Sequence, residues 1–219
     1  MTRLQPADAA AFERCLRDGG VAVFPADTVY GLACDPESAD AVGRLYALKG
    51  RPPDKPAAVM FFDPERALAA LTDLGPRTRA LLDGLLPGGV TALLPNAARR
   101  FPLACGPDPT TLGLRVPALP PAAAALHAVR APVLQSSANA AGGPDARRLA
   151  GVPAAIRRDA DLVLDGGELP GTPSTVVDLR GYEAAGEWAV LRQGAVPAEE
   201  IAQKAGRPPK RASNAVARP

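Results

Sequence analysis

The chain has 219 residues and a formal net charge of +2, and 47% of its residues are hydrophobic. This length suffices for one domain with a sizeable core, and no run of about 18 apolar residues predicts a membrane span. The N-terminal stretch carries Asp8 and Glu13 where a signal peptide would be apolar, so we expect a cytoplasmic protein. Three widely spaced cysteines indicate neither a disulfide framework nor a zinc knuckle.

Charge is unevenly distributed along the chain. The segment 204–219 contains five basic residues and no acidic one. Without it, 20 basic residues face 23 acidic ones, so charge alone does not predict a broad nucleic-acid-binding face. We expect residues 1–203 to form one domain and residues 204–219 to be a basic, disordered tail.

The first third of the chain predicts two helices and a strand. Apolar residues at helical spacing over 7–20 end at a Gly-Gly pair, and the apolar run 21–24 predicts the next strand. The stretch 24–35, FPADTVYGLACD, is interpreted as the end of this strand followed by a turn. Asp35-Pro36 predicts the N-cap and first position of a helix over 37–49, which ends at Lys49.

The rest of the body alternates between strand and helix patterns. Helical patterns occupy 66–75 and 77–89, and an alanine-rich helix-like segment contains His127. Strands are predicted at 57–62, 90–95, 112–119, 131–135, 161–165, 174–179 and 188–194. The alternation predicts an α/β (α+β) fold with a sheet core.

The segment 49–56, KGRPPDKP, places Lys49, Arg51 and Lys55 in a loop stiffened by three prolines. Rigid cations complement a polyphosphate at a low ordering cost. The alternative is a solvated loop whose cations pair with nearby acids.

Polar side chains follow several predicted strands. Ser137 and Asn139 come just after the strand at 131–135, Ser174 begins a later strand, and Arg192 lies near the end of another. Hydroxyl and amide groups at strand ends can bind phosphate or ribose, although a serine-rich turn is the better explanation of the first group when that motif is taken alone.

Several familiar site types are absent from the sequence. It has neither a P-loop nor a dinucleotide fingerprint, and its only histidine is interpreted as an ordinary helix residue. Cys34 is interpreted as a small buried hydrophobe rather than a nucleophile. An enzyme with these residues must act by positioning and charge stabilisation, as in phosphoryl or nucleotidyl transfer with a divalent metal.

Seven segments in order, FPADTVYGLACD, LKGRPPDKP, LLPGGVT, LRVP, SSANAAGGP, STVVDL and LRQGAV, resemble the motifs of the threonylcarbamoyl-adenylate synthase family. The resemblance covers about 20–196 and is closest to the short form of that family. It implies a single-domain YrdC/RibB-like fold, with a twisted mixed sheet flanked by helices around a concave basic cavity.

The resemblance also implies an activity. The family makes threonylcarbamoyl-AMP and diphosphate from L-threonine, bicarbonate or CO2, and ATP. Mg2+ is expected to arrive with ATP, with no dedicated protein cage. Other proteins then transfer the group to the adenosine beside the anticodon of tRNA, so tRNA or a transferase complex is a possible partner.

By the same resemblance, Lys49 and Arg51 are the catalytic candidates and form a polar tetrad with Ser137 and Asn139 on the nucleotide side. Three further residues, Thr28, Tyr30 and Arg115, would contact threonine and its carbamate. Two more, Ser174 and Arg192, would contact the nucleotide.

The chain departs from the family pattern at three places. Met60 stands where many members have a histidine, Ala26 replaces a hydroxyl residue, and Gly89 lies in LLPGGVT where an aromatic-Pro-Gly-Pro turn is usual. These positions bear on threonine specificity more than on nucleotide binding.

Two other functions stay open at this point. One is a relative that makes carbamoyl-adenylate from carbamoyl phosphate, since DKPAAVM also resembles a loop of hydrogenase-maturation proteins. The other is a non-catalytic RNA-binding module that uses the cavity and the basic tail, which predicts salt-sensitive tRNA binding.

Overall fold

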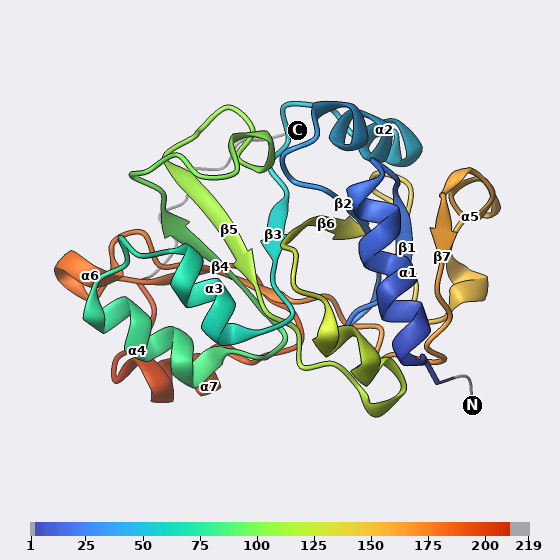
Figure 1. Cartoon of the computed structure of the whole chain (residues 1–219). Helices are drawn as coiled ribbons and strands as arrows, with labels where there is room; N and C mark the ends of the chain where they lie inside the picture. Colours follow the sequence, from blue (N-terminus) through green and yellow to red (C-terminus); the bar gives the residue numbers. More distant parts are fainter. Residues whose placement is uncertain (1–2, 211–219) are drawn as a thin grey trace.

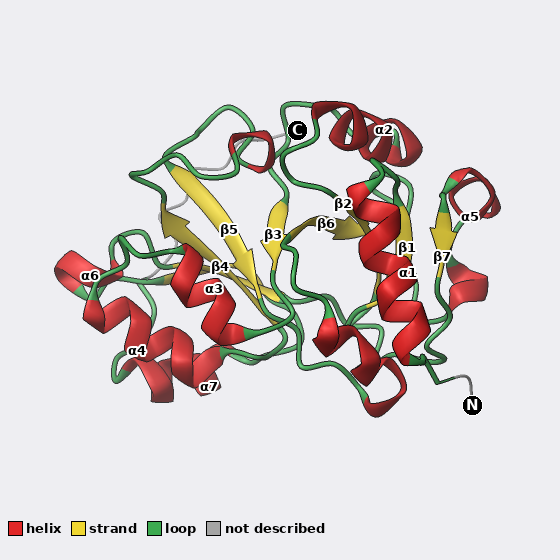
Figure 2. Cartoon of the chain, viewed as in Figure 1, coloured by secondary structure: helices red, strands yellow, loops and turns green. Residues whose placement is uncertain are grey.

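A computed structural model describes residues 3–210 of the chain. Its nine-stranded mixed sheet has the order β7-β1-β2-β6-β3-β5-β4-β8-β9. The strands are β1 (Ala22–Pro25), β2 (Tyr30–Cys34), β3 (Ala58–Met60), β4 (Val90–Pro95), β5 (Thr111–Arg115), β6 (Val133–Ser137), β7 (Leu162–Val163), β8 (Thr175–Asp178) and β9 (Ala189–Arg192). The predicted α/β fold, with one mixed sheet flanked by helices, is confirmed (Figure 2).

The helices gather mainly at the two ends of the sheet. Those described are α1 (Pro6–Arg17), α2 (Ala39–Lys49), α3 (Pro64–Ala70), α4 (Pro76–Leu85), α5 (Ala154–Asp159), α6 (Tyr182–Ala185) and α7 (Ala198–Ala205), with 3-10 helices η1 (Pro102–Ala104), η2 (Pro121–Ala128) and η3 (Leu149–Gly151). Figure 1 shows α3, α4, α6 and α7 at one end and α1 and α5 at the other. No helix within residues 3–210 is long and apolar enough to cross a membrane.

Helix α1 covers a small apolar core on one face of the sheet. Its first turn is stabilised by Pro6 and by a capping box between Gln5 and Asp8. Its buried Phe12 packs on Phe24 of β1 at a ring-centroid distance of 5.3 Å and on Phe62 at 5.8 Å. Aromatic contacts of this kind hold α1 against the sheet.

A larger core lies on the other face of the sheet. It includes Leu32, Leu45, Leu82, Leu114 and Trp188, all at most 2% exposed. Because side chains alternate along a strand, Leu112 and Leu114 of β5 enter this core, whereas Thr111, Gly113 and Arg115 face the opposite side. The face covered by α1 therefore carries the smaller apolar core and, farther along the sheet, a polar cavity.

Several local predictions need correction. The segment predicted as a turn contains β2, and α2 begins after Ser38 rather than Asp35, because the Ser38 hydroxyl accepts from Ala41 N–H at 3.3 Å. The Asp35 carboxylate instead accepts from Glu37 N–H at 2.9 Å, which closes a local turn. Strand β6 extends through Ser137, and the segment around His127 is a 3-10 helix.

The described part of the predicted tail, 204–210, contacts the rest of the chain. Helix α7 continues through Ala205, because Ile201 is fully buried and draws the helix onto the core. Beyond it, Trp188 Nε1 donates to Arg207 O at 3.1 Å, and Lys210 N–H donates to Trp188 O at 2.7 Å. The remainder of the predicted tail, 211–219, lies outside the described residues.

Candidate active site

A cavity of about 480 Å³ opens over β3, β4, β5, β6 and β8. This volume is in the range of small-molecule sites. Its charged lining residues are Arg51, Arg115, Arg180, Arg192, Asp108 and Asp145. Four arginines against two aspartates make the cavity basic, which agrees with the expectation from sequence and suits an anionic ligand.

Lys49 lies behind the cavity wall, where it connects two sequence motifs. Its Nζ donates to Asn139 O and Asn139 Oδ1, each at 2.8 Å, and to Ser137 O. The Ser137 hydroxyl donates to the same Asn139 Oδ1 at 2.6 Å. Helix α2 ends here, because Gly50 adopts a left-handed conformation with φ of 60°, and the backbone then turns toward Arg51.

The surroundings of Lys49 disfavour its positive charge. Burial is the main cause and nearby Arg51 the second, and together they lower the pKa of Lys49 to about 8, with Asp145 opposing the change. All three N–H groups of the ammonium ion have acceptors, so Lys49 is satisfied without a ligand. It is only 4% exposed and is not among the residues that line the cavity.

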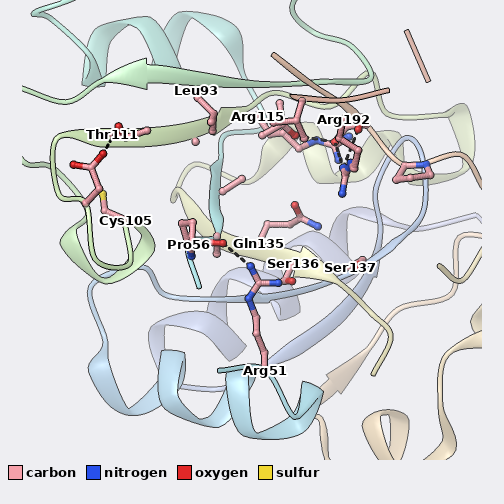
Figure 3. Close-up of a pocket in the computed structure, with 18 of the residues that line it drawn as sticks. Arg51, Pro56, Leu93, Cys105, Thr111, Arg115, Gln135, Ser136, Ser137 and Arg192 are labelled. Carbon is pink, nitrogen blue, oxygen red and sulfur yellow. Dashed lines mark hydrogen bonds between the residues drawn. The ribbon is translucent and has the colours of Figure 1, made fainter. Parts of the chain in front are cut away.

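Arg51, in contrast, points into the cavity (Figure 3). Its Nη2 donates to Pro56 O at 2.5 Å, and its guanidinium carbon lies 5.8 Å from the centroid of the Tyr46 ring. Its buried Nε has no hydrogen-bond partner within the described part of the chain. The proline-stiffened loop is anchored by Ala57 N–H, which donates to Ala104 O at 2.9 Å. Arg51 is therefore held in place and retains an unused donor.

Arg115 lies at the opposite wall in a buried ion pair with Asp27. Its Nη2 donates to Asp27 Oδ1 and to Thr28 Oγ1, the latter at 3.3 Å, while Ala118 N–H donates to Asp27 Oδ2 at 3.1 Å. Burial lowers the pKa of Arg115, and Asp27 partly opposes this. Within residues 3–210, Arg115 Nε is buried and lacks a partner. The structure thus brings the predicted residues Thr28 and Arg115 together.

Tyr30, predicted on the same side, is placed elsewhere. Its hydroxyl lies 2.8 Å from Gly167 O and 2.9 Å from Asp165 Oδ1, and it accepts from Gly166 N–H at 3.1 Å. The side chain is fully buried and does not line the cavity. In this structure it connects β2 to the 165–167 loop, so its contact with substrate stays a prediction.

The predicted nucleotide residues Ser174 and Arg192 do meet. Arg192 Nη2 donates to Ser174 O at 2.8 Å, and the Ser174 hydroxyl lies 2.8 Å from that of Thr91. Thr91 was missed from the sequence, although it is a polar residue inside the apolar strand β4. Figure 3 shows Arg192 beside Arg115 at the far wall from Arg51.

Sequence reasoning also missed several polar residues of the cavity lining, among them Gln135, Asp108, Asp145 and Arg180. The available signal for Gln135 was its position as the polar last residue of the otherwise apolar segment 131–135. The other three lie in loops or at a turn, where polar residues are common and carry little information.

The three departures from the family pattern have structural explanations. Ala26 and Met60 are fully buried in the core under α1. Gly89 packs closely, since a Cβ there would lie 2.9 Å from Ala195 Cβ and 3.5 Å from Thr28 Cγ2. Met60 is also the strand partner of Arg115, so both Met60 and Gly89 border a predicted threonine-binding residue.

Among residues 3–210, no group of three or more histidine, cysteine or acidic side chains could hold a metal ion. Asp108 and Asp145 line the cavity separately. Mg2+ typically keeps several waters and binds through one or two carboxylates plus substrate phosphates. These oxygen donors fit a metal that arrives with a nucleotide, which stays a prediction.

Comparisons with a family model and with individual relatives point to the same family. The family model Sua5_yciO_yrdC, described as "Telomere recombination", matches residues 14–194. A protein of Chromohalobacter salexigens named threonylcarbamoyl-AMP synthase is 38% identical over 179 residues, which cover 81% of this chain and 94% of the relative. The protein of that name from Halorhodospira halophila is 40% identical over 144 residues, 65% of this chain and 72% of the relative.

Solved structures agree with these matches. Sua5 from P. abyssi, in a complex with L-threonine, has a TM-score of 0.81 at 27% identity, covering 94% of this chain and 60% of that one. YciO from E. coli has a TM-score of 0.74 at 26% identity, covering 91% and 95%.

Proposed function

Because this chain belongs to the Sua5/YciO/YrdC family, we propose that it is an L-threonylcarbamoyladenylate synthase. The supporting observation is that one basic cavity is lined by Arg115 at one wall and by Arg51 and Ser137 at another, with the buried Thr28 hydroxyl accepting a hydrogen bond from Arg115 behind the lining. Two walls of this kind can receive an amino acid and a nucleotide side by side. The named synthases and the threonine-bound Sua5 support the same substrates.

The proposed reaction needs positioning and charge stabilisation rather than a covalent enzyme intermediate. The amine of threonine takes up CO2 and loses a proton to form a carbamate. A carbamate oxygen then attacks the α-phosphorus of ATP, the bond to the β,γ-diphosphate breaks, and pyrophosphate leaves with its electron pair. Arg51 and Arg115 both line the cavity and would place positive charge close to the negative charge that develops.

The residues of the proposed site have different tasks. Arg51, Ser137, Ser174 and Arg192 would bind the nucleotide side, and Arg115 with Thr28 would bind the carboxylate and carbamate side. Lys49 would act on the nucleotide indirectly, since its three donors are used to hold Ser137 and Asn139. Mg2+ would arrive with ATP and share the phosphate charge, with Asp145 as a cavity carboxylate available to its water ligands.

The test is an incubation of the purified chain with ATP, Mg2+ and bicarbonate, with and without L-threonine. We expect release of pyrophosphate that requires threonine, with threonylcarbamoyl-AMP identified by mass spectrometry. Release that ignores threonine but requires carbamoyl phosphate would favour the carbamoyl-adenylate alternative.

We further propose that the product serves threonylcarbamoyl modification of a tRNA adenosine in the cytoplasm. Threonylcarbamoyl-AMP is a mixed anhydride, so a separate transferase has to use it soon after release. Adding tRNA together with a threonylcarbamoyl-transferase complex should convert the adenylate into modified tRNA, and the chain alone should leave tRNA unmodified.

A further inference from the structure

Gln135 projects from the floor of the cavity at the middle of the sheet. It lies on β6, paired with Ala33 of β2 on one side and with Ala58 of β3 on the other. Figure 3 shows its carboxamide between Arg51 on one side and Arg115 with Arg192 on the other. It therefore occupies the junction between the two walls of the proposed site.

Most of Gln135 is buried, but its carboxamide opens into the cavity and the protein does not use it. The residue is 7% exposed and lines the cavity, and within residues 3–210 its amide has no hydrogen-bond partner, although it is not among the polar atoms shut off from the cavity. Its amide lies over Gly31, where an added Cβ would come within 3.0 Å of Nε2. A buried amide that faces a cavity without a protein partner is costly unless water or a ligand satisfies it.

The amide also differs in chemistry from the groups around it. The arginines of the cavity only donate hydrogen bonds, and its carboxylates only accept them. A carboxamide places one donor and one acceptor on the same planar group. The oxygens of ATP phosphates only accept, so they would leave the Gln135 acceptor unused.

A carbamate matches this pattern. Its N–H group donates and the carbamate oxygen on the same side accepts, so a carboxamide can form two parallel hydrogen bonds with it. The carbamate must also lie where the amino acid meets the α-phosphate, which is the junction that Gln135 occupies. We propose that Gln135 binds the carbamate of threonine and aligns its free oxygen for attack. This inference rests on the proposed function.

The main test is Gln135→Met, which keeps the side-chain length and removes both hydrogen-bonding groups. Loss of hydrogen bonds to a charged group should lower kcat/KM for L-threonine and for bicarbonate by about tenfold or more. The affinity for ATP, measured by calorimetry without threonine, should change by less than about twofold. Exposed Gln203→Met is the matched control and should leave all three values unchanged.

A second variant, Gln135→Glu, keeps both shape and burial. Its carboxylate should repel the carbamate and lower kcat/KM for threonine further than the methionine variant does, while thermal unfolding confirms that it folds. Unchanged threonine and bicarbonate kinetics in both variants, or a loss confined to ATP affinity, would overturn the inference.

Pyrophosphate release by the wild-type protein distinguishes a failure of this inference from a failure of the proposed function. If its pyrophosphate release does not depend on threonine, the proposed function fails. If that dependence is present but Gln135→Met matches wild type, only the role of Gln135 fails.

Discussion

The cation behind the cavity and two of the arginines that line it form different kinds of contact. Behind the cavity, Lys49 donates all three of its N–H groups to the 137–139 segment and is complete without a ligand. In the cavity, Arg51 and Arg115 are fixed by protein contacts, yet each keeps a buried Nε without a partner in the described part of the chain. A cation whose donors are all used by the protein stabilises the shape of a site, whereas a cation held in the cavity lining can act on an anionic ligand directly.

The largest effect should come from breaking the buried ion pair. Arg115→Met leaves the Asp27 carboxylate buried without its cation, so we expect a loss of about 3–5 kcal/mol in the free energy of unfolding. Chemical denaturation measures this loss. Combining it with Asp27→Asn should restore much of the stability, and a single variant as stable as wild type would contradict the pairing.

Arg51→Ala should mainly affect catalysis. Removing one donor that faces developing charge typically lowers kcat by about 10²–10³-fold, and threonine-dependent pyrophosphate release measures this. Exposed Arg66→Ala on α3 is the control and should behave as wild type. A folded Arg51→Ala protein with full turnover would contradict a role for Arg51 in catalysis.

Lys49 should make activity sensitive to alkaline pH. Protonated Lys49 supplies three hydrogen-bond donors, whereas the neutral amine has two. Because the pKa of Lys49 is about 8, the loss of this proton falls in a pH range that activity assays cover. We expect kcat/KM for ATP, at saturating threonine, to fall about tenfold per pH unit above that value.

The Lys49 prediction has two controls. Lys49→Arg should remove the alkaline fall between about pH 7 and 10, because arginine stays charged, and exposed Lys55→Met should keep it. An unchanged alkaline fall in Lys49→Arg would assign the titration to another group.

The smallest effect concerns the C-terminal segment. Deleting 206–219 removes Arg207 O, which accepts from the buried Trp188 indole, and should lower the free energy of unfolding by about 1–2 kcal/mol. Deleting only 211–219 is the control. Turnover should stay within about twofold of wild type in both proteins, and a large drop would give this segment a role in catalysis.

The sequence alone predicted the fold class and most of the strands. Alternation of strand and helix patterns is a local property, and so are the helix that ends at Lys49 and the proline-stiffened loop that carries Arg51. The ordered motifs also indicated the family, and they selected residues that do meet in space, such as Thr28 with Arg115 and Ser174 with Arg192.

Only the tertiary structure decided what each side chain faces. Lys49 and Ser137 are 88 positions apart, and Tyr30 is 137 positions from Gly167, so no local pattern shows that one ammonium and one hydroxyl are already satisfied. Gln135 was overlooked for the same reason, since its significance comes from the strands on either side. Local sequence determines backbone conformation, but distant segments must meet before a polar group is either satisfied or left free for a ligand.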